Sequence, residues 1–473
     1  MSERHFHPTD ATGTEVAERS LTLLLDEAIG GANAPDCADE VLAALASRSS
    51  GAPGPRERRW PGLAAAVLVA AALGVVFLLH SSPKADPVPA TELRQDRPLP
   101  DPVRVYSRAD VERLPADTQS VHGTFLPLEA VRALGRLRKL RALDLSVPSR
   151  YSIDAKSPPP PKLDAAMVAA IAELRGLEVL RLDRQPGNDL RPLGRLTELR
   201  VLSLAGGGAD ARTLQSLQVL PHLFEIDLRG CRSVDDSAVE ALTKFPELRV
   251  LRLGMLSWLR PASLCAVLRA TRKLEVLDLA SVDPRMSAFS RRKAPADAGV
   301  DARVVAEIAK LKRLRELDVS NCKRIDDAML AELAHCTALR RLALGGCDAV
   351  TDRGLTALPA ELTDLSLDLT AVTGSGLARF PDLVSLGLVH TVQLDPEQVS
   401  RFLRGPARRT LHEFRLCSQR PEFARVLDDL PRCTELRVLN LSSNAWMTNA
   451  HVGALESLAP RLQRLSLFGV GGV

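Results

Sequence analysis

The stretch LRELDVSNCKRIDDAMLAEL, Leu314 to Leu333, decides the fold of this chain. Its first six residues follow the pattern L-x-x-L-x-L, in which Leu317 and Val319 point to one face of a short strand and Asp318 to the other, exposed face. The second half, after Asp327, has apolar residues at helical spacing. One strand and one helix cannot bury their own apolar faces. The stretch therefore predicts a unit that is stable only when stacked on copies of itself.

Copies of this pattern recur along the C-terminal two thirds of the chain. Their spacing is mostly within the range of short structural repeats, and two wider spacings, after Leu140 and after Leu274, indicate insertions. Thirteen copies begin at Leu140, Leu177, Leu199, Leu223, Leu248, Leu274, Leu314, Leu339, Leu362, Leu383, Leu411, Leu436 and Leu462. This periodicity predicts a repeat array with one continuous apolar core.

Three copies carry cysteine three residues after their last core residue, at Cys231, Cys322 and Cys347, and Asn444 fills the same slot in NLSSN. A small side chain that can hydrogen-bond the turns beneath the sheet fits this slot. Over most of the chain after Leu140 the pattern resembles the leucine-rich repeat family, and the cysteines resemble its cysteine-containing subfamily, best known from the substrate-recognition arms of F-box proteins. The resemblance implies an α/β solenoid, with a parallel concave sheet and a convex side of helices and turns. No F-box-like segment is evident, so the ubiquitin-ligase role of those relatives does not carry over.

Residues Gly62 to Leu79, GLAAAVLVAAALGVVFLL, form an uninterrupted apolar run. As a helix the run spans roughly 27 Å, which predicts a single transmembrane helix. A cleaved signal peptide and a buried helix are the alternatives. Arginines are more frequent before the run than after it, which predicts a cytoplasmic N-terminus with the repeat array outside the cytoplasm of a bacterial inner membrane.

The remaining sequence divides around this apolar run. We expect a small helical cytoplasmic segment over 1–55, the membrane helix over 62–79, a proline-rich stalk over 80–119 and the repeat array over 120–473. Within the array, 121–133 is expected to form an atypical first repeat or cap, and 149–162 and 281–300 to form surface loops. The last repeat stops just after its strand, so the array looks truncated or open.

Composition and motifs argue against several classes of function. The 473 residues carry a net charge of +4 with acids and bases spread along the chain, and 3% are aromatic, which disfavours a nucleic-acid partner. No hydrolase, zinc-protease, phosphate-loop or dinucleotide motif is present, so we expect no enzyme, no cofactor, no metal site and no small-molecule substrate. The repeat pattern predicts that most of the eight cysteines are buried and reduced.

The concave face of the expected sheet is the candidate binding surface, and its mixed charges suit a protein ligand. Its candidate residues are Val179, Arg181, Val201, Asp227, Val250, Arg252, Val276, Asp278, Glu316 and Asp318. Trp258 and Trp446 lie at equivalent loop positions and are candidate anchors for a partner, although each can equally pack under its own loop. The alternative is that the strand residues only form an ordinary sheet surface.

Two functions are consistent with these features. The first is a membrane-anchored protein that binds a protein partner through the solenoid. The second is a transmembrane signal relay, in which binding outside alters what the cytoplasmic helices hold. An enzyme with an unrecognised site is a third, weaker hypothesis.

Overall fold

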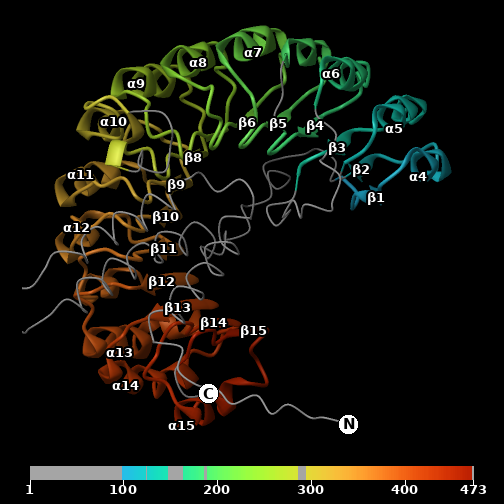
Figure 1. Cartoon of the computed structure of the whole chain (residues 1–473). Coiled ribbons are helices and arrows are strands. Elements are labelled where there is room, and N and C mark those ends of the chain that lie inside the picture. The colour runs from blue at the N-terminus through green and yellow to red at the C-terminus, as the bar shows by residue number, and fades with distance from the viewer. Residues whose placement is uncertain (1–98, 124, 148–162, 186–188, 286–293, 471–473) are drawn as a thin grey trace, which may run out of the picture. The chain divides into compact units, whose positions relative to one another are not determined.

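The computed structural model describes residues 99–123, 125–147, 163–185, 189–285 and 294–470. Within this part of the chain, a 15-stranded sheet runs in strict sequence order, and every neighbouring pair of strands is parallel. Figure 1 shows the strands side by side along the inner side of the array and the helices along its outer side. We call the sheet face that points away from the helices the concave face.

The elements alternate between strand and helix from one end of this unit to the other. The strands are β1 (Val103–Val105), β2 (Ser120–Gly123), β3 (Ala142–Asp144), β4 (Val179–Arg181), β5 (Val201–Ser203), β6 (Glu225–Asp227), β7 (Val250–Arg252), β8 (Val276–Asp278), β9 (Glu316–Asp318), β10 (Arg341–Ala343), β11 (Asp364–Ser366), β12 (Ser385–Val389), β13 (Glu413–Cys417), β14 (Val438–Asn440) and β15 (Arg464–Ser466). The α-helices are α4 (Arg108–Arg113), α5 (Leu128–Ala133), α6 (Ala165–Ala172), α7 (Ala211–Ser216), α8 (Asp236–Ala241), α9 (Pro261–Ala270), α10 (Ala302–Ile308), α11 (Asp327–Glu332), α12 (Asp352–Ala357), α13 (Pro396–Arg404), α14 (Ala424–Leu427) and α15 (Asn449–Gly453). Short 3₁₀ helices take the place of an α-helix after β4, as η2 (Arg191–Arg195), and after β11, as η7 (Ser375–Arg379).

Several expectations fall on residues outside this description. They are the cytoplasmic segment 1–55, the apolar run Gly62 to Leu79 and the whole insertion 149–162. Among the residues that are described, no helix is long and apolar enough to cross a membrane.

The array begins earlier than the consensus pattern indicates. Strand β1 and helix α4 both lie within 80–119, the range in which the sequence suggested a stalk, and β1 pairs with β2 in the same sheet. Helix α4 is capped by Ser107, whose hydroxyl accepts a hydrogen bond from the backbone N–H of Asp110. The part of 80–119 from β1 onward is therefore folded into the array.

The apolar core runs through the array without a break, as the repeat pattern predicted. Most strands have a central leucine that lies opposite that of the next, as Leu277, Leu317, Leu342 and Leu365 do in β8 to β11. These four side chains are at most 2% exposed. Each buried leucine contributes roughly 1.5–3 kcal/mol before the entropy of ordering is subtracted. Leucines from neighbouring repeats bury one another, so the stability is collective.

A left-handed residue follows the strand in nearly every repeat. In the repeat of β9 this residue is Asn321, with φ 60°, and its N–H donates to the carbonyl of Gly345 in the next repeat at 2.6 Å. The same hydrogen bond recurs at Arg184, Gly206, Gly230, Met255, Ser281, Gly346, Leu369, His390 and Ser443, all of which have positive φ. The turn therefore extends the backbone ladder past the strand, at a conformational cost that is smallest for glycine and asparagine.

In several repeats the residue after this turn bonds to the preceding repeat. Cys231 donates to the carbonyl of Leu204 at 2.9 Å, and Cys347 to that of Val319 at 3.3 Å. Asn444, which is fully buried, does the same with the carbonyl of Leu416 at 2.8 Å. Cysteine and asparagine therefore share this slot because both can satisfy a buried carbonyl of the preceding repeat.

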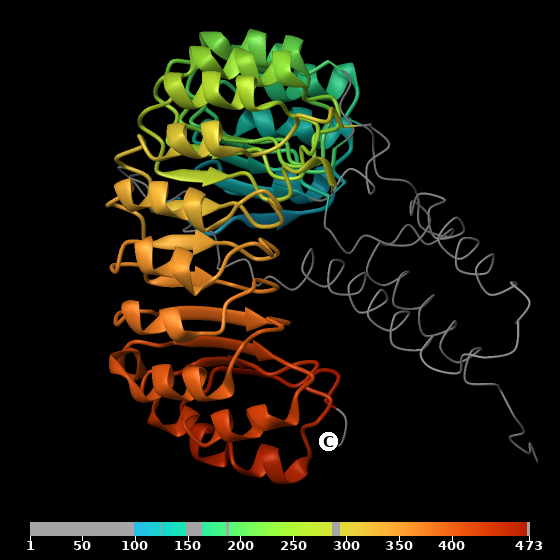
Figure 2. The same ribbon diagram turned by 90° about the vertical axis from the view of Figure 1, so that its left-hand side faces the viewer.

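The two rims of the sheet, one where the strands end and one where they begin, differ in their charged residues. Where strands end, many of the helices begin with aspartates, and Asp210, Asp235 and Asp326 accept hydrogen bonds from the first turns of α7, α8 and α11. Successive helices lie side by side on the outer side in Figure 2. Where the helices end and the next strands begin, the exposed residues are largely arginine and lysine. Both distributions complement the helix dipoles.

Three helices have an aspartate as their first residue, one position after the capping residue. Helices α8, α11 and α12 begin at Asp236, Asp327 and Asp352, and the capping side chain comes from the residue before. These three carboxylates instead accept hydrogen bonds from the following repeat. Asp352, for example, accepts from the backbone N–H groups of Thr373 at 2.7 Å and Gly376 at 2.8 Å.

Candidate functional site

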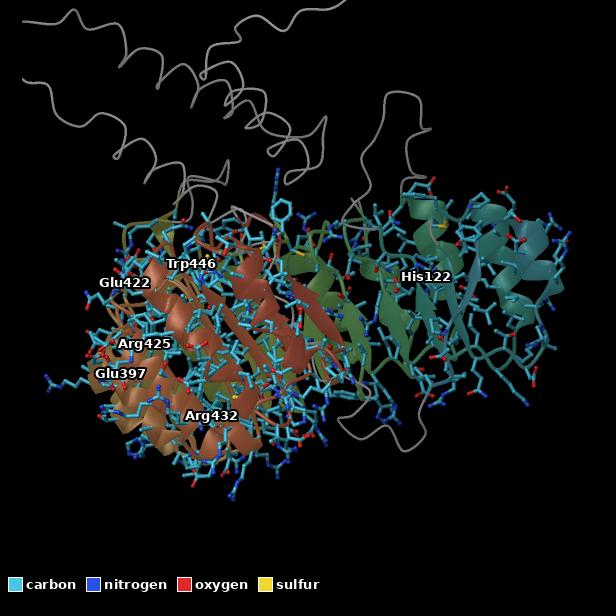
Figure 3. All side chains as sticks on the ribbon, turned by 90° about the horizontal axis from the view of Figure 1, so that it is seen from below. His122, Glu397, Glu422, Arg425, Arg432 and Trp446 are labelled. Atoms are coloured by element: carbon cyan, nitrogen blue, oxygen red, sulfur yellow. The ribbon has the colours of Figure 1, made fainter. Side chains whose placement is uncertain are left out.

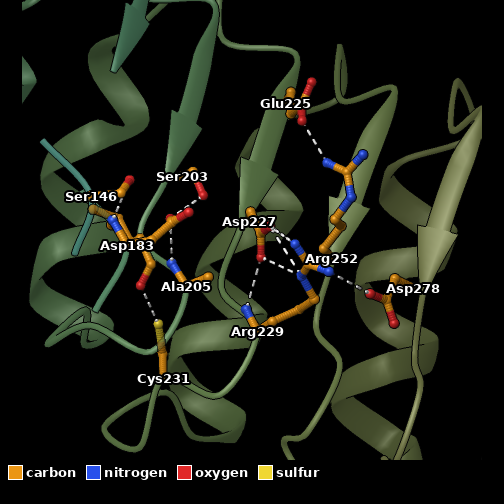
Figure 4. Close-up of polar contacts among 11 residues, drawn as sticks. Ser146, Asp183, Ser203, Ala205, Glu225, Asp227, Arg229, Cys231, Arg252 and Asp278 are labelled. Carbon is orange, nitrogen blue, oxygen red and sulfur yellow. Dashed lines mark hydrogen bonds and ion pairs between the residues drawn. The ribbon is translucent and has the colours of Figure 1, made fainter. Parts of the chain in front are cut away.

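The concave face of β4 to β9 holds a network of charged side chains (Figure 4). The strands place them in register, because equivalent residues of parallel neighbours lie directly opposite each other. The network contains five carboxylates and two arginines, of which all but Asp318 are labelled in Figure 4: Asp183, Glu225, Asp227, Asp278, Asp318, Arg229 and Arg252.

Glu225 on β6 and Arg252 on β7 form a buried ion pair, with 2.5 Å between Oε1 and Nη1. Glu225 is 5% exposed and Arg252 is 7% exposed. The second carboxylate oxygen of Glu225, Oε2, is buried and has no hydrogen-bond partner. Burial raises the pKa of Glu225, and the attraction of Arg252 only partly offsets it.

Arg229 lies in the turn after β6 and links two strands. Its guanidinium contacts Asp227 at 2.6 Å and reaches Asp278 on β8 at 3.7 Å. Burial opposes its charge, but these carboxylates raise the pKa of Arg229 above its ordinary value. Arg229 therefore stays charged and ties β6 to β8.

Asp278 and Asp318 face each other across β8 and β9. Each accepts a hydrogen bond from the backbone N–H two residues ahead, of Ala280 and Ser320, both at 2.9 Å. Burial, followed by the repulsion of Asp318, raises the pKa of Asp278 to about 7, and burial also raises that of Asp318. Arg229 contacts Asp278 but forms no ion pair with Asp318 in the described part of the chain.

Asp183, in the turn after β4, closes the network on its N-terminal side. Its carboxylate accepts hydrogen bonds from the hydroxyl of Ser203 and from the N–H of Ala205, the latter at 3.2 Å. Its own N–H donates to Ser146. Burial raises its pKa, because these hydrogen bonds only partly compensate for lost solvation.

The apolar candidates lie on the same face but are largely covered. Val179 and Val201 form a separate cluster with Ala142, and Leu99 and Phe224 pack against it. Val250 and Val276 are also buried. Among the polar candidates Asp227 and Arg252 are buried, Asp278, Glu316 and Asp318 are partly buried, and Arg181 is exposed. The expectation that Asp318 is a freely exposed residue is therefore wrong, because neighbouring side chains crowd this face.

The two candidate tryptophan anchors both bond to the preceding repeat. Trp258 is 4% exposed, and its Nε1 donates to the carbonyl of Val234 at 2.6 Å. Trp446, labelled in Figure 3, is partly buried and donates to the carbonyl of Ser418 at 2.8 Å. Each indole joins successive loops, and a role in binding a partner stays a prediction.

A second buried ion pair on this face was missed by the sequence analysis. Arg415 on β13 lies 3.6 Å from Asp368 and 3.8 Å from Glu413. Gly387 on β12 makes room for it, because a Cβ there would lie 2.6 Å from Nη2 of Arg415 and 2.8 Å from Oδ1 of Asp368. The signal in the sequence was a glycine in the middle of an otherwise apolar strand.

Two kinds of reactive site were looked for among the described residues, a metal cluster and an activated thiol. The described residues contain no group of three side chains that could hold a metal ion. The sulfur of Cys417 lies 3.6 Å from the His390 ring, but burial raises the pKa of the thiol to about 12 and lowers that of the imidazole. The thiol is therefore not activated as a nucleophile.

The repeat geometry and a family match agree on the class of fold. Residues 335–358, which contain β10 and α12, match the family model described as Leucine Rich repeat. Together with the parallel sheet and the recurring turns, this match defines a leucine-rich repeat solenoid. A search of the curated proteins finds no significant match.

Solved structures give general similarity only. An internalin from Listeria monocytogenes is 15% identical, with a TM-score of 0.39, over 76% of this chain and 92% of that one. The yeast Rad7 and Elc1 complex contributes a chain that is 15% identical, with a TM-score of 0.46, over 98% and 94%. A Leptospira interrogans leucine-rich repeat protein is 16% identical, with a TM-score of 0.35, over 78% and 88%.

Proposed function

We propose that this protein is an interaction protein that binds a protein partner through the concave face of its repeat array. The observation that carries the proposal is the register of the charged network on β4 to β9, which fixes side chains of both signs on one continuous sheet. A preorganised surface of this kind favours binding, because little side-chain entropy remains to be lost. Arg181 is exposed on the same face and is available to a partner.

Site-specific photo-crosslinking tests this proposal. A photoreactive residue in place of Arg181 is compared with one in place of Arg353, an exposed residue of α12 on the helical side. We expect one protein to be captured in intact cells from position 181 and not from position 353. Equal capture from both positions, or capture from 353 alone, contradicts binding through the concave face.

The membrane anchor is part of the proposal. An uninterrupted apolar run over Gly62 to Leu79 and the arginines before it support a single span, with the N-terminus in the cytoplasm and the array outside. Carbonate-washed membranes should retain the full-length chain, and a chain without 1–82 should appear in the supernatant. Protease added outside the inner membrane should degrade the array and spare the segment 1–55.

A signal relay is the alternative use of the same plan. A relay requires a cytoplasmic partner for residues 1–55, whereas a tether does not. Full-length protein and a chain without these residues should therefore capture the same cytoplasmic proteins if the protein is a tether, and different ones if it is a relay.

A further inference from the structure

A dense group of cations lies where α9 and α10 end and the strands β8 and β9 begin. We call it the basic edge, defined by segments 269–275 and 307–315. It holds seven cationic side chains and two carboxylates, Glu275 and Glu307. The cations are Arg269, Arg272, Lys273, Lys310, Lys312, Arg313 and Arg315.

Glu307 is the centre of this group. The residue is 5% exposed, and its carboxylate contacts Arg269 at 3.0 Å, Arg272 at 2.9 Å and Lys310 at 3.0 Å. Burial disfavours its charge, but hydrogen bonds from these three cations lower the pKa of Glu307 to about 2. One carboxylate therefore organises three exposed cations and neutralises only one of them.

Of the other four cations, Lys273 pairs with Glu247 at 2.5 Å, and the remaining three form no ion pair within the described residues. Arg313 and Arg315 are exposed and form no ion pair within the described part of the chain. Lys312 is exposed too, and among the described residues its ammonium donates to the carbonyls of Ala309 and His335, at 3.4 and 3.2 Å. Arg315 lies directly beside the neighbouring repeat, since its N–H donates to the carbonyl of Glu275 at 2.8 Å.

The helix dipoles account for part of this charge. Two helices end here, and each places about half a negative charge at its C-terminus. The two helix ends and the two carboxylates together offset about three of the seven positive charges, so an excess of cations remains. Solubility alone does not explain why three cations are gathered around one buried carboxylate, because isolated surface charges would serve it equally well.

We propose that the basic edge is a second interaction surface, separate from the concave face, and that it binds an acidic polypeptide segment. Within the fold, guanidinium groups of this edge already bind a carboxylate, because Glu307 accepts hydrogen bonds from Arg269 and Arg272. A carboxylate of a partner suits the same side chains. Acidic residues among the cations, such as Glu275, lower the positive potential of the surface. Such a surface suits a polypeptide whose carboxylates are spaced along the chain.

Nucleic acid fits this surface less well. Duplex DNA carries one negative charge per about 1.7 Å and favours an unbroken basic field. Single strands favour aromatic side chains for stacking, and neither segment of the basic edge contains an aromatic residue.

Fluorescence anisotropy with the full-length chain tests the proposal, with labelled polyglutamate as the probe. The variant Arg313→Glu/Arg315→Glu removes two cations that hold no other element in place. We expect binding to weaken about tenfold, because each exposed contact is modest but two charges are reversed. Binding of the unaltered chain should also weaken as salt is added.

The matched control is Arg212→Glu/Arg353→Glu, which makes the same charge change at two exposed residues of α7 and α12. The control should bind as the unaltered chain does. The milder variant Arg313→Gln/Arg315→Gln should give an intermediate loss. Equal binding by the charge-reversed variant and the unaltered chain overturns the proposal, as does an equal loss in the control. Tighter binding of duplex DNA than of polyglutamate overturns it as well.

Discussion

Asp278 and Asp318 occupy the same position on adjacent parallel strands, so two carboxyl groups face each other about one strand spacing apart. Arg229 is the cation that reaches this pair, through Asp278 at 3.7 Å. Like charges this close cannot both ionise without cost, so the pair holds a proton at pH values where an exposed aspartate has lost it.

The first prediction follows from the pKa of Asp278, which burial and Asp318 raise to about 7. An acid whose folded pKa is raised stabilises the fold at low pH, and this stability is lost as the pH rises through about 7. The unaltered array should therefore melt at a lower temperature at about pH 8 than at about pH 5, with a loss of up to about 1.4 kcal/mol per pH unit. Asp278→Asn should reduce this difference. Asp382→Asn, at an exposed position, is the control, and an equal reduction there would contradict the assignment.

Gly387→Ala should separate Arg415 from Asp368. The added methyl group would lie 2.6 Å from the guanidinium and 2.8 Å from the carboxylate, and both residues are buried. We expect a loss of about 1–3 kcal/mol in the free energy of unfolding, from overpacking and a weakened buried pair. Gly453→Ala is the matched control, since a Cβ there meets nothing within 4 Å. Chemical denaturation of the two variants decides between them.

Leu317→Ala should leave a cavity in the middle of the core. The side chain is 2% exposed and lies between the central leucines of β8 and β10, so the local loss should be roughly 2–5 kcal/mol. Hydrogen exchange should show the loss concentrated in the neighbouring repeats, because each repeat depends mainly on the two beside it. Arg313→Ala, at an exposed site, should stay within about 0.5 kcal/mol of the unaltered chain.

Asn444→Ala should cost more stability than Cys347→Ala. The Asn444 side chain accepts from the N–H of Ser418 and donates to the carbonyls of Leu416 and Leu441. Its removal leaves three buried backbone groups unpaired, at about 1–3 kcal/mol each before relaxation. Cys347 makes one weak S–H bond, to Val319, so its loss should cost about 1 kcal/mol. Comparable losses in melting experiments would show that the slot works by packing alone.

The repeat could be predicted from the sequence because its leucines recur at strand spacing. Leu317 and Val319 are buried as the alternation requires, and Cys322 lies in the expected slot. The first repeat could not be predicted, because the three residues of β1 match no consensus and its neighbouring prolines suggested a stalk.

The sequence predicted which face of the sheet the candidate residues occupy, but not how deeply they are buried. Alternation along a strand tells which face Asp227 or Arg252 occupies, but not how closely the neighbouring strands bring their side chains together. Charge partners such as Arg229 come from the turn after the strand, where no periodicity reveals which way a side chain points. The concave network therefore appears only once the repeats are stacked.

The aspartates at one rim of the sheet and the excess of cations at the other give the array an electric dipole across its width. Aspartates gather where many of the helices begin, and arginines and lysines gather where they end, so many of the repeats add to the same asymmetry. The net charge of the chain is only +4, but this dipole orients the array in the electric field of a charged partner or surface. A negatively charged partner is attracted to the cationic rim, and the electrostatic field therefore sets the orientation of the encounter before any side chain makes contact.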